Sequence, residues 1–398
     1  MSSQNGETAA AAAPILDLVT LIITTSPTPS APSTDLISDI LASFKRHCAA
    51  LLSCRVIVVL DTYDRIGACM RLKKGQITPE GAAAVEVYKR NVKDLILAHW
   101  CPCPYSCPHH ATNSNSEGNG EKREGEEETN TATASQFFTQ SSSLAEYGNP
   151  RLPDNHVALT ILQTPGRRVT FVEPAARLGF GLAVREALRR VETPYVWVQQ
   201  HDWPLVRDIP LADLVGVMRA SETEGEGKVP VKYVCLPAVR MLSYATSAHV
   251  VPFPALRALT AELKREFVVP GSSQQQPDHH HGGSSGGIPL TPLFFWHDKP
   301  HIASTAHYLA RVFPSRLALA RGDFIEDTVG QRARKQMKEG NWAKWACWLY
   351  YPGEGTEVCL QHRHGRKWRG FEADTQIKAL AEEMRGREKR GEMLLDGS

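Results

Sequence analysis

The chain has 398 residues, 42% of them hydrophobic and 22% charged, with a formal net charge of +2. This composition is typical of a globular protein with a sizeable core, and the near-neutral charge gives no overall electrostatic argument for binding nucleic acid or an anionic membrane. The apolar runs are too short to cross a bilayer, and the N-terminus lacks a secretory signal pattern. We therefore expect a cytoplasmic protein with no transmembrane segment and no nucleic-acid partner. Its nine cysteines, an odd number, favour reduced thiols.

Shifts in composition divide the chain into three parts. We expect a disordered Ala-rich N-terminus over 1–14, one α/β domain over 15–370, and a terminal helix or tail over 371–398. Two low-complexity tracts, at about 101–150 and 271–287, are predicted to be disordered insertions within that domain, because they hold few large apolar residues to bury.

The first half of the domain begins with a strand, helix and strand. Residues 18–25 form a continuous apolar, β-branched run, which predicts a strand covered on both faces. A Pro-rich loop and a helix over 35–52 follow, and 55–61 is a second buried strand that ends on Asp61. The connection between two such strands is expected to be a right-handed parallel crossover.

A cluster of thiols and imidazoles follows a helix that Thr78 and Pro79 open. Cys101, Cys103 and Cys107 precede two histidines, and these groups could hold zinc. The spacing lacks a second paired knuckle, so the favoured interpretation is a Pro-rich loop that leads into the first insertion.

The central segment of the domain contains strands over 156–162 and 168–173, then a helix over 178–188 that begins Gly-x-Gly. A short buried strand over 195–198 follows, and it ends abruptly in Gln199-Gln-His-Asp202. Because the carboxyl ends of strands in an open α/β sheet face the ligand crevice, these polar side chains are candidates for a site. The alternative is that Asp202 only caps a turn.

The order of these segments resembles the GT-A fold of nucleotide-sugar-dependent glycosyltransferases, particularly the family 2-like members. The resemblance covers about 15–370 and implies a Rossmann-like, mostly parallel sheet flanked by helices. It also implies that Thr24, Thr25 and Ser26 touch the nucleotide of a nucleotide-sugar donor, and that Asp61 reads its base.

The same resemblance assigns a diphosphate site. Gly181-Leu-Ala-Val-Arg185 is similar to the family's G-x-a-x-A-R helix, and Gln200-His-Asp202 stands where the family has Asp-x-Asp. These positions imply that Gly181, Arg185 and Gln200 bind substrate, and they imply a divalent metal, Mn²⁺ or Mg²⁺. The implied ligands are Asp202, His201, His362 and His364. Gln200 replaces the first carboxylate of the motif, so metal-assisted and metal-independent chemistry both stay open.

Two downstream stretches complete the expected site. Glu326 and Asp327 precede a basic helix, and they resemble the Glu-Asp pair that supplies the catalytic base in inverting GT-A enzymes; Asp327 is the first choice, Glu326 the second, and Asp323 a further candidate. The alternative is that these acids only cap a helix. Basic side chains that could clamp phosphate oxygens follow at Arg363, Arg366, Lys367 and Arg369.

The sequence thus predicts a glycosyltransferase that moves a sugar from a nucleotide diphosphate to an unknown acceptor, with inversion. Two alternatives remain: a non-catalytic GT-A-like protein that binds nucleotide sugars, and a nucleotidyltransferase. The nucleotidyltransferase ranks last, because the loop 26–33 contains three prolines and no basic residue.

Overall fold

The computed structural model describes residues 14–101, 138–152, 154–222, 229–268 and 287–389. In this part of the chain an eleven-stranded sheet forms the centre of the molecule, in the order β10-β11-β13-β9-β12-β8-β1-β2-β7-β6-β5. Its strands are β1 (Val19–Thr25), β2 (Arg55–Leu60), β5 (Thr139–Glu146), β6 (His156–Gln163), β7 (Val169–Pro174), β8 (Tyr195–Gln200), β9 (Tyr233–Cys235), β10 (Arg265–Phe267), β11 (Ile288–Pro292), β12 (His301–Ser304) and β13 (Cys347–Tyr350). Two short strands, β3 (Arg65–Ile66) and β4 (Gln76–Ile77), pair separately.

The sheet is mixed, which corrects the prediction of a mostly parallel sheet and confirms the α/β class. Strands β7, β2, β1 and β8 are parallel neighbours at its centre, and β13 is parallel to β9. The other pairings are antiparallel. Short connections explain part of the difference, since the loop 164–168 between β6 and β7 is too short for a parallel crossover.

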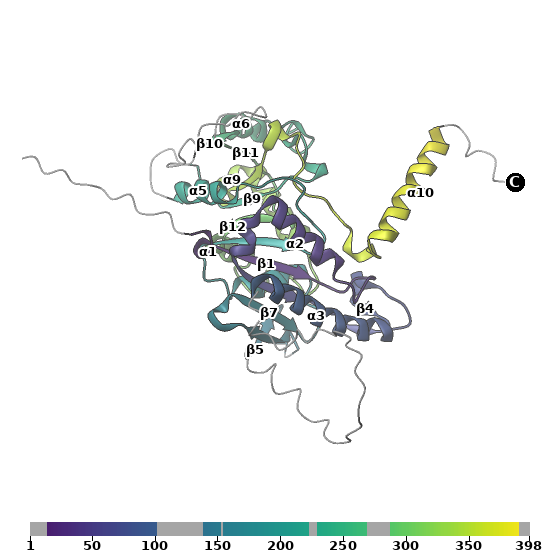
Figure 1. The fold of residues 1–398 in the computed structure, drawn as a ribbon. Helices are drawn as coiled ribbons and strands as arrows, with labels where there is room; N and C mark the ends of the chain where they lie inside the picture. The colour runs from purple at the N-terminus through teal and green to yellow at the C-terminus, as the bar shows by residue number, and fades with distance from the viewer. Residues whose placement is uncertain (1–13, 102–137, 153, 223–228, 269–286, 390–398) are drawn as a thin grey trace, which may run out of the picture.

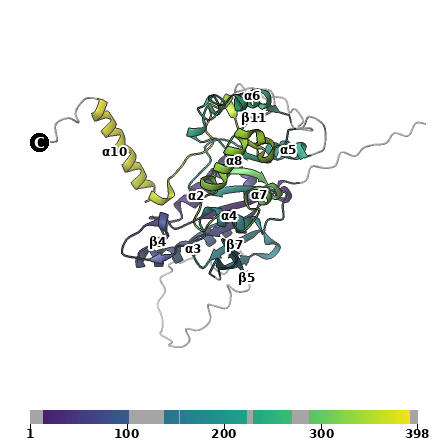
Figure 2. The same cartoon turned by 180° about the vertical axis from the view of Figure 1, so that it is seen from behind.

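Helices cover both faces of the sheet. In Figure 1 α2 (Asp35–His47) and α3 (Pro79–Trp100) lie in front of it, and Figure 2 shows α4 (Phe180–Leu188), α7 (Thr305–Val312) and α8 (Gln331–Gln336) on the opposite face. All residues of β1 are buried, as its continuous apolar run predicts for a central strand. The other α-helices in the described ranges are α1 (Ile15–Leu18), α5 (Leu211–Glu222), α6 (Pro254–Leu263), α9 (Trp342–Trp345) and α10 (Phe371–Lys389).

The structure describes most of the predicted C-terminal helix or tail and only the last residue of the predicted N-terminal segment. Helix α10, within the segment predicted as a terminal helix or tail, projects from the body of the molecule in both views (Figures 1 and 2). The predicted disordered N-terminus and almost all of the 271–287 insertion lie outside the described residues, as do Cys103 and Cys107 of the possible zinc cluster. None of the helices in the described ranges is long and apolar enough to span a membrane.

Strand β5 corrects the extent of the first predicted insertion. Residues 139–146 pair antiparallel with β6 along their whole length and form one edge of the sheet. The strand was missed because its sequence, Thr-Gln-Ser-Ser-Ser-Leu-Ala-Glu, is polar, and most of its side chains are exposed on an edge that needs little apolar area. Only Ala145 of this strand is buried.

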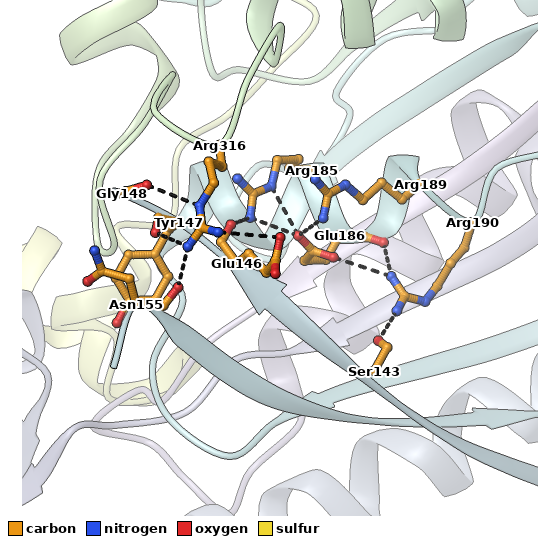
Figure 3. Close-up of polar contacts among 10 residues, drawn as sticks. All are labelled: Ser143, Glu146, Tyr147, Gly148, Asn155, Arg185, Glu186, Arg189, Arg190 and Arg316. Atoms are coloured by element: carbon orange, nitrogen blue, oxygen red, sulfur yellow. Dashed lines mark hydrogen bonds and ion pairs between the residues drawn. The ribbon is translucent and has the colours of Figure 1, made fainter. Parts of the chain in front are cut away.

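A network of guanidinium groups joins β5 to α4 (Figure 3). Glu186 of α4 is buried, and its carboxylate contacts Arg185 at 2.9 Å, Arg189 at 3.1 Å and Arg190 at 3.6 Å. Arg185 also donates to the backbone carbonyl of Glu146 in β5. A buried charge is costly unless it is paired, so this network fixes the edge strand to the helix.

Arg316 extends the same network beyond the end of β5. Its guanidinium donates to the carbonyls of Tyr147, Gly148 and Asn155 at 2.9 to 3.1 Å, and it lies 3.6 Å from the carboxylate of Glu146 (Figure 3). One side chain from the segment after α7 therefore organises the turn between β5 and β6.

Candidate functional site

The ends of the four parallel strands meet at one cleft of about 360 Å³. Residues directly after β1, β2 and β8 line it, together with the segment after β7 that leads into α4. This is the place where an open α/β sheet is expected to bind a ligand. Ten of the predicted site residues line the cleft: Thr24, Thr25, Ser26, Asp61, Gln200, His201, Asp202, Glu326, His362 and His364.

His201 connects the end of β8 to the loop after β1. Its Nδ1 lies 2.7 Å from the hydroxyl of Thr25 and accepts a hydrogen bond from the backbone N–H of Ser26 at 3.3 Å. The Thr25 hydroxyl in turn lies 2.5 Å from the hydroxyl of Tyr88. Burial lowers the pKa of His201, so the imidazole is neutral at pH 7, with Nδ1 as the acceptor and the proton on Nε2.

Asp61 forms part of the cleft wall. Its carboxylate accepts hydrogen bonds from the backbone N–H groups of Thr62, Leu178 and Gly179 at 2.7 to 2.9 Å. These bonds attach the end of β2 to the start of α4. Burial raises the pKa of Asp61, and the three N–H groups oppose that rise by favouring the carboxylate. Asp61 therefore has a structural task besides the base contact that the resemblance implies.

Two glycines allow the chain to pass close to this helix start. Gly179 has a φ of +80°, and a Cβ there would lie 2.4 Å from the Cα of Gly322, which has a φ of +90°. Both positions thus require glycine, for conformation and for space. The contact brings the segment 322–326 to the cleft.

Asp202 is held by a loop from the C-terminal part of the chain. Its Oδ2 accepts from the backbone N–H of Gly365 at 2.9 Å and lies 3.1 Å from Nε2 of His362. Burial opposes ionisation, but the hydrogen bond from His362 and the electrostatic effects of His201 and His362 lower the pKa of Asp202 to about 2. The His362 ring stacks on Trp203, with centroids 4.2 Å apart and planes 6° apart.

The predicted metal ligands engage one another and the backbone. One oxygen of Asp202 already receives two hydrogen bonds, and Nδ1 of His201 faces Thr25 and Ser26. Over the described ranges no group of three or more His, Cys, Asp or Glu side chains is arranged to hold a metal ion. In this arrangement Asp202, His201 and His362 form hydrogen bonds within the protein, and the divalent metal stays a prediction.

Positive side chains line the cleft from three segments: Arg177 after β7, Lys299 before β12, and Arg366 and Lys367 in the C-terminal loop. The Arg366 guanidinium lies over the ring of Phe324, 5.0 Å from its centroid. Arg366 and Lys367 match the predicted phosphate contacts. The other two predicted cations do not line the cleft, because Arg363 is bonded to Asp39 at 2.9 Å and Arg369 is exposed elsewhere.

Of the predicted Glu-Asp pair, Glu326 lines the cleft and Asp327 does not. Its Oε2 lies 3.5 Å from Nδ1 of His297 and 4.0 Å from Nζ of Lys299, and it accepts from the backbone N–H of Asp298 at 3.4 Å. The hydrogen bond from His297, with the charge of Lys299, lowers the pKa of Glu326 to about 2. Glu326 is therefore ionised at neutral pH.

Asp298 also lines the cleft, and sequence reasoning missed it. Its Oδ1 accepts from the backbone N–H of Glu326 at 3.2 Å, and its carbonyl accepts from the side-chain amide of Gln200 at 2.8 Å. Burial and the negative charge of Glu326 raise its pKa well above the usual value. The available signal was a polar His297-Asp-Lys299 directly after an aromatic run, which resembles the end of β8.

Three further predicted site residues, besides Arg363 and Arg369, do not line the cleft. Asp327, the first choice for the base, is exposed beside it. Gly181 is a packing position, because a Cβ there would lie 2.6 Å from a methyl group of Leu319. Arg185 is buried in the network with Glu186. The further candidate Asp323 lies outside the lining as well, and its carbonyl accepts from the N–H of Gly181.

No protein-family model matches the chain, and a search of curated proteins likewise finds no match. The functional argument therefore depends on the geometry of the cleft.

Proposed function

We propose that the protein is a glycosyltransferase that moves a sugar from a nucleotide-diphosphate donor to an acceptor hydroxyl, with inversion. The observation that carries the proposal is the convergence of four parallel strand ends on one cleft that also contains basic side chains and an ionised carboxylate. In this interpretation the half of the sheet around β1 and β2 is Rossmann-like, and the nucleotide lies across the ends of these strands.

The donor's diphosphate would lie against the basic side chains. Arg366 and Lys367 come from the C-terminal loop, and Arg177 and Lys299 line the cleft from other segments. Guanidinium and ammonium groups form strong, charge-assisted hydrogen bonds with phosphate oxygens. They can offset the negative charge that builds on the leaving diphosphate as the bond to the anomeric carbon breaks.

Glu326 is the proposed base. As the acceptor oxygen forms its bond to the anomeric carbon, the acceptor's proton passes to this carboxylate, and the nucleoside diphosphate leaves with the electron pair of the broken bond. Glu326 suits the role better than Asp327 because it lines the cleft, whereas Asp327 is exposed outside the lining.

The second candidate is a non-catalytic protein that binds nucleotide sugars in the same cleft. The engagement of Asp202 with His362 and Gly365 favours it, because this carboxylate serves the architecture of the site. The two candidates share a ligand and differ in turnover.

One experiment tests both. Purified protein is titrated by calorimetry with UDP, GDP and a panel of their sugar conjugates, and each conjugate is then incubated to detect hydrolysis or transfer. Binding with turnover supports the transferase, and binding without turnover supports the second candidate. An absence of binding across the whole panel would overturn both.

A further inference from the structure

The carboxyl group of Asp298 has one oxygen with a partner and one without. The residue is only 3% exposed, and its Oδ1 accepts the N–H of Glu326. Its Oδ2 is buried and finds no hydrogen-bond partner among the described residues. Buried polar atoms are almost always paired, and leaving one unpaired is costly. Because Asp298 itself is among the lining residues of the cleft, a polar group of a bound ligand is a candidate for the missing partner.

The surroundings of Asp298 favour its neutral form. Burial is the main reason, the negative charges of Glu326 and Asp327 add to it, and the charge of Lys299 opposes it. The groups that face Asp298 from the sheet are the Tyr308 hydroxyl and the Cys235 thiol. Both have raised pKa values and are neutral at neutral pH, so they bring no charge to Asp298. Two carboxyl groups whose environments separate their pKa values take different roles. Glu326 stays a carboxylate, and Asp298 in its neutral form would present an O–H donor.

We propose that Asp298 binds a hydroxyl group of the donor sugar through Oδ2, next to the base Glu326, and so contributes to the choice of sugar. This inference rests on the proposed function, because the sugar lies at the Glu326 end of the cleft only if the donor binds as described. A neutral carboxyl can donate one hydrogen bond and accept another, which matches the two capacities of a hydroxyl group.

Two variants distinguish a hydroxyl contact from a structural role. Asp298→Asn keeps an acceptor for the Glu326 N–H and places an N–H donor where Oδ2 stands, whereas Asp298→Ala removes both. Tyr308→Phe is the matched control, because the Tyr308 hydroxyl is a buried polar group that interacts with Asp298 but does not line the cleft.

The measurement compares the dissociation constants of each nucleotide sugar and of its bare nucleoside diphosphate. We expect Asp298→Ala to raise the dissociation constant of the sugar conjugate by about tenfold or more and that of the bare diphosphate by less than about twofold. Asp298→Asn should stay within about threefold of wild type for both ligands, and Tyr308→Phe should change neither. Circular dichroism and urea unfolding check that each variant is folded.

The outcomes separate the two proposals. If UDP or GDP binds but Asp298→Ala weakens the conjugate and the bare diphosphate equally, or weakens neither, the inference on Asp298 is wrong and the donor site remains. If Asp298→Ala does not fold, a loss of conjugate binding in Asp298→Asn alone contradicts the neutral-donor role. If wild-type protein binds no ligand of the panel, the proposed function fails first.

Discussion

The carboxylate of Asp202 accepts the backbone N–H of Gly365 at 2.9 Å and thereby joins the end of β8 to a loop near the C-terminus. A side chain at residue 365 has no room, because its Cβ would lie 2.6 Å from Nε2 of His201 and 3.1 Å from Oδ2 of Asp202. The loop that carries Arg366 and Lys367 can therefore approach Asp202 this closely only because residue 365 is a glycine.

Gly365→Ala should therefore displace the basic loop and lower the free energy of unfolding by about 1–3 kcal/mol, the usual range for overpacking. It should also weaken nucleoside diphosphate binding. Gly340→Ala is the control, since Gly340 has open space around it and lies outside the cleft lining; it should cost some stability through its φ of +85° but leave binding unchanged. Equal binding by both variants would contradict the contact.

The low pKa of Asp202 makes stability depend on pH at the acid end. Its folded-state pKa of about 2 lies below the ordinary value of 3.8, so the ionised form stabilises the fold above about pH 4 and this contribution is lost as the pH falls toward 2. The shift corresponds to about 2 kcal/mol. Asp202→Asn should lose about that amount at pH 7, and its urea-derived stability should fall less than that of wild type between pH 4 and pH 2. An unchanged slope would show that Asp202 is not the group responsible.

Variants of Glu326 and Asp327 test which of these two predicted residues is the base. Glu326→Gln should lower the rate of transfer by about 10²-fold or more, because proton transfer to a positioned carboxylate contributes that much, while the affinity for the nucleotide stays close to wild type. Asp327→Asn, at an exposed position outside the cleft lining, should change the rate only a few-fold. The reverse result would restore Asp327 as the base.

Arg366 should contribute to diphosphate binding in a salt-dependent way. Arg366→Met should raise the dissociation constant of UDP or GDP by about tenfold or more, since charge-assisted hydrogen bonds contribute about 1.5–3 kcal/mol each. The difference from wild type should shrink as salt rises. Arg369→Met, in the same segment but outside the cleft lining, should bind like wild type. A salt-independent loss would indicate a packing role on Phe324.

Arg185 should matter for stability and not for binding. Arg185→Met leaves the buried Glu186 with fewer partners and should lower the free energy of unfolding by about 3–5 kcal/mol, the range for breaking a buried ion pair. Arg189→Met removes a 42% exposed partner of the same carboxylate and should cost less than about 1 kcal/mol. Chemical denaturation measures both. A folded Arg185 variant with weakened nucleotide binding would instead support the original substrate-binding prediction.

Local pattern was enough to predict which residues lie at the centre of the cleft. The apolar runs of β1, β2 and β8 identify buried strands, and the polar residues after them lie at the crevice for that reason. Asp298 could not be found this way, because its position depends on the antiparallel strand β12 lying beside β8, a long-range pairing that no local spacing reports. Strand β5 was missed for the same reason, since its partner β6, and not its own propensity, makes it a strand.

Arg185 shows the opposite failure. Arg185 has the spacing after Gly181 that the motif requires, but α4 directs its side chain toward β5 and away from the cleft. There it pairs with the buried carboxylate of Glu186 and donates to the carbonyl of Glu146. The sequence therefore predicts the helix, but tertiary packing determines which surface the Arg185 side chain contacts.

The cleft wall draws on residues from Thr24 to Lys367, so almost the entire domain must be assembled before a ligand can find its full set of contacts. Binding is then linked to global unfolding and not to a local opening, and a ligand at one hundred times its dissociation constant should add about 2.7 kcal/mol to the stability of the whole domain. A fragment that ends before residue 362 would lose the loop of Gly365, Arg366 and Lys367, and with it that protection. Resistance to proteolysis in the presence of nucleotide would therefore report on the integrity of the complete chain.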